Sequence, residues 1–110
     1  MSYVASHRFA RIAPRKARLV ADQIRGAAVD RALATLEVSK RRGGWYLRSV
    51  LKSAIANAEE KSADVARLVV SEVRVDEGPT IKRFQPKDRG RAHPIRKRTS
   101  HIHVAVEERD

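Results

Sequence analysis

The fold of this chain is decided by residues 68–106, LVVSEVRVDEGPTIKRFQPKDRGRAHPIRKRTSHIHVAV. Apolar and polar residues alternate near both ends of this stretch, over 71–76 and over 101–106, which predicts two β-strands with one buried face each. The residues predicted on the buried face of the first strand are Ser71, Val73 and Val75. Between the strands, residues 78–100 contain few apolar side chains and a high density of positive charge. The stretch therefore predicts antiparallel strands that continue outward as a long basic hairpin.

The charge of this predicted hairpin is almost entirely positive. Its basic residues in 82–98 are opposed only by Asp88, and they are Lys82, Arg83, Lys87, Arg89, Arg91, Arg96, Lys97 and Arg98. A solvated or disordered loop is the alternative interpretation, but apolar residues interrupt the charges as they would on a two-faced ribbon. About 14 residues per arm at about 3.3 Å each would span roughly 45 Å. Because a two-stranded ribbon is marginally stable in water, we expect it to lie on a phosphate surface.

Glycine and proline residues shape the hairpin. Gly90, between Arg89 and Arg91, is predicted to form the turn at the tip, where the backbone can approach a partner closely. Prolines 79, 86 and 94 cannot donate ladder hydrogen bonds, so we expect them to bend or interrupt the ribbon. The resulting shape suits an irregular RNA site better than a DNA major groove.

Three helices and one further strand are predicted before residue 68. Apolar residues recur at helical spacing over 14–25, over 29–36 and over 44–61. Residues 3–11 are interpreted as a strand. The predicted fold class is α+β, with three helices packed on a small antiparallel sheet and a long basic hairpin extending from the body. We expect one domain over 1–110, with the body at 1–77 and 101–110 and the hairpin at 78–100.

The composition favours a polyanionic partner. The chain has 110 residues, with 24 lysines and arginines against 13 acidic residues and a formal net charge of +11. Such an excess repels itself unless a polyanion neutralises it, and nucleic acid is the commonest one. An anionic membrane is the weaker alternative, because the charge is not concentrated on one amphipathic helix. No apolar run approaches a membrane span, so a soluble intracellular protein is expected.

Basic residues also crowd the predicted starts of two helices. They are Arg15, Lys16 and Arg18 at the first helix, and Lys40, Arg41 and Arg42 at the third. Cations at these positions oppose the helix dipole, whereas a bound phosphate would accept both the side chains and the helix N–H groups. A solvated basic face is the alternative. Trp45 is expected in the core, with stacking in the bound complex as its alternative role.

No constellation for catalysis or metal binding is present in the sequence. Cysteine is absent, and His101 and His103 would share one strand face without a third ligand beside them. The adjacent acids 59–60 and 107–108 lack a partner that would tune a pKa for acid–base chemistry. We therefore expect no enzymatic activity, no metal and no cofactor.

Several motifs resemble one family along nearly the whole chain. They are PRKARLVAD at 14–22, IRG at 24–26, SAIANAE at 53–59, VDEGP at 75–79, GRA at 90–92 and KRTSHI at 97–102. In this order they resemble the bacterial large-subunit ribosomal protein L-twenty-two family. Lys87-Asp88, His93-Pro94 and Gly43-Gly44-Trp45 depart from the family pattern.

The resemblance implies a place in the large ribosomal subunit of the cytoplasm. Members bind 23S-type rRNA beside other large-subunit proteins, support early assembly, and line the polypeptide exit tunnel with their hairpin, near the macrolide site and the nascent polypeptide. The implied wall-lining tip is Pro86, Lys87, Asp88, Arg89, Gly90, Arg91, Ala92 and His93. We expect rRNA contacts from the basic residues named above and from Arg8 and Arg11. An architectural DNA-binding protein and an RNA-modifying enzyme are the other classes considered.

Overall fold

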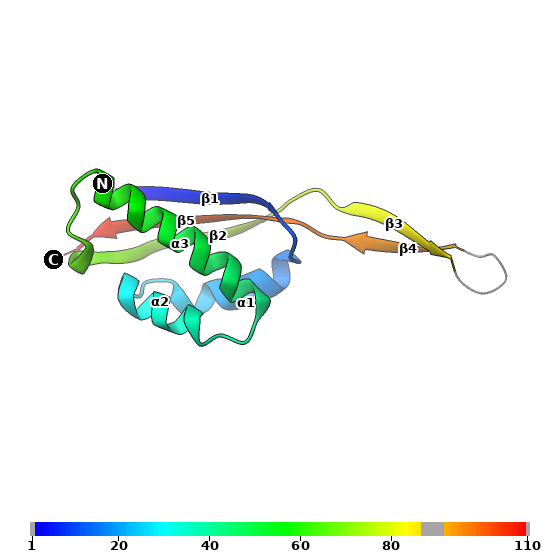
Figure 1. Cartoon of the computed structure of the whole chain (residues 1–110), viewed down its shortest axis with the longest axis horizontal. Helices are drawn as coiled ribbons and strands as arrows, with labels where there is room; N and C mark the ends of the chain where they lie inside the picture. Colours follow the sequence, from blue (N-terminus) through cyan, green and yellow to red (C-terminus); the bar gives the residue numbers. More distant parts are fainter. Residues whose placement is uncertain (1, 87–91, 110) are drawn as a thin grey trace.

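The computed structural model describes residues 2–86 and 92–109, and for residues 81–86 and 92–96 it describes the backbone alone. Figure 1 shows an elongated molecule in which a helix-covered sheet carries a projecting hairpin. The elements in chain order are β1 (Ser2–Ala10), α1 (Pro14–Ile24), α2 (Val29–Glu37), α3 (Arg42–Glu60), the 3-10 turn η1 (Val65–Arg67), β2 (Leu68–Glu77), β3 (Ile81–Pro86), β4 (Ala92–Lys97) and β5 (Ser100–Glu108).

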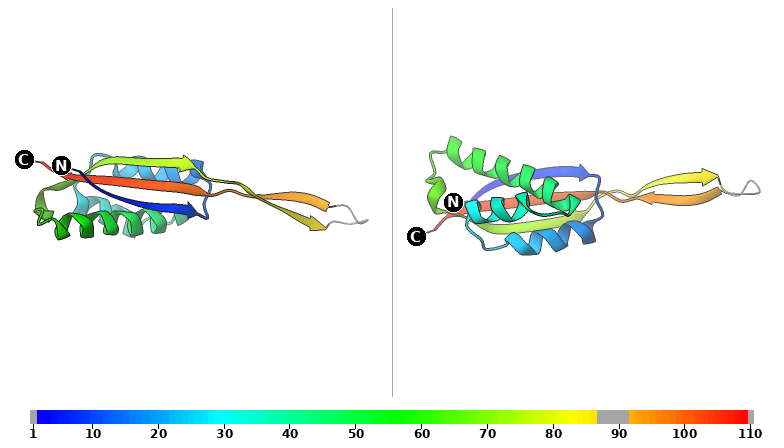
Figure 2. Two further views of the ribbon diagram at one scale, coloured as in Figure 1. Left: turned by 90° about the horizontal axis from the view of Figure 1, so that it is seen from above. Right: turned by 60° about the horizontal axis from the view of Figure 1, so that its bottom comes forward.

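The body has two layers. Strands β1, β5 and β2 form an antiparallel sheet in that order, with β5 in the middle. The three helices cover one face of this sheet, as the two views of Figure 2 show. The predicted α+β class, with three helices on a small antiparallel sheet, is confirmed.

The core lies between the helices and the covered face of the sheet. Alternate residues of β5, namely Ile102, Val104 and Val106, are fully buried, as the period of two predicts. The helices contribute residues at i, i+3 and i+4 spacing, among them Val20 and Ile24 of α1 and Leu47 and Leu51 of α3. Burying a side chain of this size stabilises the fold by about 1.5–3 kcal/mol.

A bulge in β2 makes one part of the sequence prediction wrong. The pairing of β2 with β5 shifts between Val70 and Glu72, so Ser71 is an extra residue. Val70 and Val73 are buried, whereas Ser71 is only half-buried and its hydroxyl donates to the Ala105 carbonyl at 3.1 Å. At the bulge two residues of β2 lie opposite one residue of β5, so the alternation of buried and exposed side chains along β2 shifts by one position.

A second bulge lies near the end of β1. The register passes from His7 opposite Ile102 to Ala10 opposite Ser100, so Arg8 and Phe9 share one partner position. Phe9 has a φ of 60° and its side chain is 57% exposed. The bulge returns Ala10 to the buried side, where the chain enters the turn to α1.

The helix boundaries follow the predictions closely, with one informative difference. Helix α1 begins at Pro14 as expected, and Gly26 beyond its end has a φ of 81°, a conformation that favours glycine. Helix α3 begins at Arg42, two residues before the predicted start, so Gly43 and Gly44 lie in its first turn. A β-carbon on Gly43 would meet Val20 at 3.2 Å, so glycine lets α3 approach α1 closely. In residues 2–86 and 92–109, no helix is long and apolar enough to cross a membrane.

Side chains from the helices protect both edges of the sheet. The Arg18 guanidinium on α1 donates from Nε and Nη2 to the Val75 carbonyl, at 3.1 and 2.9 Å. The Arg25 guanidinium donates to the neighbouring carbonyl of Val73 at 3.0 Å. On the opposite edge, the Asn57 amide on α3 donates to a β1 carbonyl at 2.9 Å. Covering edge-strand carbonyls in this way discourages pairing with another chain.

The hairpin continues from β2 and β5. Strands β3 and β4 form a separate two-stranded ladder, from Ile81 opposite Lys97 to Pro86 opposite Ala92. The molecule measures 64 Å along its longest axis against 24 and 16 Å along the others. Pro79 lies in the break between β2 and β3, as predicted, whereas Pro94 pairs within β4 without interrupting it. A two-stranded ladder has two outer edges, where proline is tolerated. The predicted turn at Gly90 lies outside the described residues.

The junction between body and hairpin, residues 78–80 and 98–100, contains the two buried polar side chains of the described core, Thr99 and Ser100. The Thr99 hydroxyl donates to the Pro79 carbonyl at 2.6 Å, and the Gly78 amide donates to the Thr99 carbonyl at 2.9 Å. The Ser100 hydroxyl donates to the Ile12 carbonyl at 2.7 Å. These bonds join the start of β5 to both the outgoing arm and the turn that precedes α1.

We predict that Ser100→Ala lowers the free energy of unfolding by roughly 1–3 kcal/mol, because a buried carbonyl loses its donor. Urea denaturation followed by circular dichroism measures this change. Ser53→Ala is the matched control, since its exposed hydroxyl bonds only to the Ser49 carbonyl within α3. The control should change stability by less than about 0.5 kcal/mol. Equal effects of the two substitutions would contradict the role given to the buried hydrogen bond.

Candidate nucleic-acid interface

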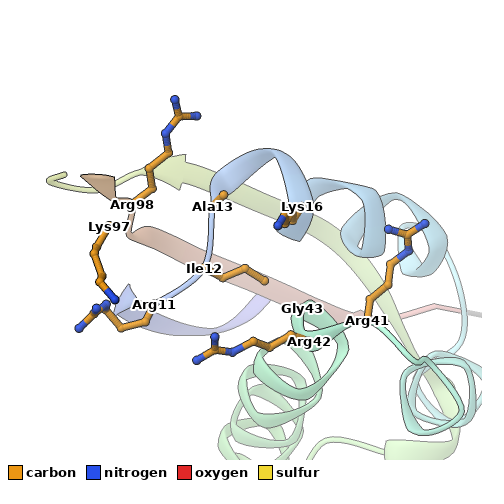
Figure 3. Close-up of a pocket in the computed structure, with 9 residues that line it drawn as sticks. All are labelled: Arg11, Ile12, Ala13, Lys16, Arg41, Arg42, Gly43, Lys97 and Arg98. Carbon is orange, nitrogen blue, oxygen red and sulfur yellow. The ribbon is translucent and has the colours of Figure 1, made fainter. Parts of the chain in front are cut away.

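A cleft of about 870 Å³ lies at the base of the hairpin, and we call it the basic cleft. Four separate segments form it: the turn between β1 and α1, the first turn of α1, the start of α3, and the end of β4 with its junction. Figure 3 shows the lining residues, which are Arg11, Ile12, Ala13, Lys16, Arg41, Arg42, Gly43, Lys97 and Arg98. Its size falls in the range of pockets that hold small organic ligands.

The floor of the cleft is fixed by close packing. Gly43 lies against Ile12 and α1, where an added β-carbon would meet the Ile12 side chain at 3.3 Å. The Ile12 carbonyl in turn accepts the hydrogen bond from Ser100. The segments that carry the charged side chains are therefore held together by the core and the junction, before any ligand is present.

The charge of the cleft is positive and uncompensated. Its six cationic side chains are exposed, and in the described part of the chain none of them forms an ion pair with a carboxylate. The helices that begin at the cleft, α1 and α3, have no side-chain cap and no acidic residue in their first turns. Mutual repulsion of these cations disfavours the free state, and a phosphate backbone relieves it.

Arg42 is the one cleft cation with a described side-chain partner. Its Nη2 donates to the Tyr46 hydroxyl at 3.3 Å, and its guanidinium carbon lies 5.8 Å from the centre of the Tyr46 ring. Tyr46 is buried, so this contact orients the guanidinium at the mouth of the cleft. A planar guanidinium held in one orientation is suited to bidentate phosphate contact.

The structure brings together some of the predicted binding residues and leaves others apart. Arg11, Lys16, Arg41, Arg42, Lys97 and Arg98 meet in the basic cleft. Arg8, Arg15 and Lys40 are exposed outside it. Arg18 is engaged with the Val75 carbonyl, so its first role is to join α1 to β2. The remaining predicted contacts, Lys82, Arg83, Lys87, Arg89, Arg91 and Arg96, and the predicted tip at 86–93, lie outside the residues whose side chains are described.

The prediction that Trp45 belongs to the core is wrong. Trp45 is 64% exposed, and its neighbour Tyr46 occupies the buried position at 7% exposure. The apolar stripe of α3 contains Leu47 and Leu51, and position 45 lies about 200° from Leu47 around the helix. A helical projection of α3 would therefore have predicted that Trp45 is exposed. The prediction of burial rested instead on the size and hydrophobicity of tryptophan. The uncharged floor residues of the cleft were also missed, because nothing in the local sequence distinguishes them.

The histidines on the open sheet face have structural partners. His103 lies 2.8 Å from the Ser6 hydroxyl and 3.4 Å from an Asp76 carboxylate oxygen. His101 accepts the Phe9 amide at 3.1 Å and packs edge-on against the Phe9 ring. Among residues 2–86 and 92–109, no group of three potential metal-ligating residues occurs.

The fold and the site together define a polyanion-binding protein, a helix-covered sheet with a basic cleft where its hairpin begins. A model of the family described as Ribosomal protein L22p/L17e matches residues 5–107, nearly the whole chain. The chain belongs to this family, and the identification from its motifs is confirmed. It is a structural protein of the large ribosomal subunit that binds rRNA, and the family is of a non-enzymatic kind.

We predict that neutralising three cleft cations makes rRNA binding less sensitive to salt. Each phosphate contact contributes about 0.7–0.9 to the slope of log K against log salt concentration. The triple variant Arg11→Gln, Lys16→Gln, Arg98→Gln should therefore lower that slope by roughly two to three. The measurement is a filter-binding titration with large-subunit rRNA at several salt concentrations.

The matched control removes the same charge elsewhere. Arg31, Lys52 and Lys61 are exposed and lie outside the cleft, so their replacement by glutamine should change the slope by less than about one. Both triple variants change exposed residues only, so neither should lower the melting temperature. A slope that falls equally in both variants would show that the cleft is no more important than the general charge.

Proposed function

We propose that the chain anchors its body on rRNA through the basic cleft and extends its hairpin along the wall of the polypeptide exit tunnel. In this arrangement the body lies near the outer end of the tunnel, and the tip at 86–93 faces the nascent polypeptide at the narrow part. The observation that supports the proposal best is the position of the cleft at the point where the hairpin leaves the body.

Two residues connect the cleft to the hairpin. Lys97 is the last residue of β4, Arg98 follows it in the junction, and both line the cleft. Basic residues continue from there along both arms, at Lys82, Arg83 and Arg96. A phosphate backbone bound in the cleft could therefore continue along the basic residues of the hairpin. We assign rRNA contacts to these residues and to Arg8, Arg15, Lys40, Lys87, Arg89 and Arg91.

The length of the hairpin supports contacts with distant parts of the rRNA. The chain's radius of gyration is 16.9 Å, against about 13 Å for a compact chain of this length. A projecting two-stranded ladder gains little stability from its own contacts, so it needs another surface to lie on. A protein that bridges distant rRNA segments would hold them together as the subunit forms, which supports a role in early assembly. The site of action is then the large subunit of cytoplasmic ribosomes, beside other large-subunit proteins.

Cleavage of rRNA from tethered iron tests this placement directly. The chain contains no cysteine, so one introduced cysteine carries the only iron chelate. We predict that a chelate at Ala92→Cys cleaves rRNA at the narrow part of the tunnel, and that one at Ala34→Cys, exposed on α2, cleaves only near the outer end. The cysteine-free wild type should give no cleavage. Cleavage from Ala92→Cys confined to the outer surface of the subunit would contradict the tunnel placement.

A further inference from the structure

Trp45 is the only tryptophan of the chain, and most of its side chain faces solvent. It lies in the first turns of α3, where residues three and four positions away are neighbours on the helix surface. Arg41 lies at i−4, Arg42 at i−3 and Arg48 at i+3 from it. The helical spacing therefore places Arg42 and Arg48 on the same face of α3 as the indole, and Arg41 immediately precedes the helix.

No acidic residue lies near this tryptophan in the sequence, and no described ion pair neutralises the arginines beside it. Between Glu37 and Glu59 the sequence contains basic residues but no aspartate or glutamate. In residues 2–86 and 92–109, no ion pair engages Arg41, Arg42 or Arg48. An approaching partner therefore meets uncompensated positive charge.

The indole packs against the buried Tyr46 ring. Its ring centroid lies 4.9 Å from that of Tyr46, at an interplanar angle of 80°. The Tyr46 ring packs in turn against His7 of β1, with centroids 5.4 Å apart. This edge-to-face contact holds the indole against Tyr46, while most of the Trp45 side chain remains exposed and available for stacking.

The combination of an exposed flat aromatic ring with arginines identifies the class of partner. A second copy of this chain, with a net charge of +11, or another basic protein would be repelled. A nucleotide satisfies both features, because its base stacks on the ring and its phosphates bind the guanidinium groups. Bases inside a duplex are already stacked on one another, so the partner must be unpaired.

We propose that Trp45 stacks on an unpaired base of the bound RNA, with the flanking phosphates held by Arg41, Arg42 and Arg48. The inference rests on the proposed rRNA contact, since Arg41 and Arg42 also line the basic cleft. An RNA strand that leaves the cleft over the start of α3 would reach the indole directly. The site adds a base contact to a surface that otherwise binds only phosphate.

Intrinsic fluorescence tests the proposal, because all tryptophan emission comes from Trp45. The full-length protein is titrated with a single-stranded oligoadenylate of about ten nucleotides, a length typical of one single-strand binding site. A perfect RNA duplex and an abasic strand of equal charge serve as comparison ligands. Quenching is expected with the oligoadenylate alone, although all three ligands bind through their phosphates.

Substitutions separate stacking from charge. Trp45→Ala should weaken oligoadenylate binding about tenfold, the loss expected for one stacked base, and leave abasic-strand binding unchanged. Trp45→Phe should retain most of the affinity, because an aromatic face remains. Val4→Ala is the matched control, since Val4 is also an exposed apolar residue but lies on β1 beside the far half of α3. All variants should melt at the wild-type temperature.

The other outcomes overturn the inference in distinguishable ways. If all three ligands bind but none quenches Trp45, the stacking site fails and the phosphate-binding cleft remains. If polyglutamate quenches Trp45 as strongly as oligoadenylate and depends equally on Trp45, the surface binds acidic protein and the nucleotide assignment is wrong. If no nucleic acid binds, large-subunit rRNA included, the proposed rRNA interface fails together with the stacking site.

Discussion

The pairing of β5 with strands on both of its sides is the constraint on which the rest of the structure depends. β5 is the middle strand of the sheet, and its buried residues meet helices from the first half of the chain. Its pairing with β2 also sets the direction of the hairpin, because β4 leads into β5 and β2 leads into β3 through one short junction. The buried hydroxyls of Thr99 and Ser100 lock that junction to the body. The core therefore determines both the shape of the body and the direction in which the hairpin projects.

The same geometry explains where the positive charge gathers. The turn after β1, the starts of α1 and α3, and the end of β4 all reach the end of the sheet from which the hairpin leaves. Each of these segments brings cations, and the described residues there offer no carboxylate to pair with them. In the free protein, repulsion among these cations lowers stability. A bound RNA phosphate backbone removes this repulsion, which favours binding. The arginines that cover the β2 edge, Arg18 and Arg25, have a different role, since their guanidinium groups bind backbone carbonyls.

Much of the architecture could be predicted from the sequence, because helices and strands bury one face at their own periods. The apolar stripes of the three helices and the alternation in β5 gave the fold class, and the ordered motifs gave the family. The bulge at Ser71 could not be predicted, because an extra residue in a strand depends on the register with its partner. The start of α3 was placed too late, because a glycine pair resembles a connection until the close approach of α1 is known. The cleft could be predicted only in part. Its basic residues were recognised in the sequence, but the tertiary fold determines which of them lie close together.

The most direct test of the central claim, that the body folds by itself and the hairpin serves the RNA, is to replace residues 81–97 with a short turn. This change removes seven basic residues and one acid, a net charge of +6. Thermal unfolding and salt-dependent binding to large-subunit rRNA are then measured on the same sample. The account predicts a cooperative melt close to that of the full chain, together with weaker rRNA binding and a shallower salt dependence. Loss of the cooperative melt, or rRNA binding that is unchanged in strength and salt dependence, would contradict it.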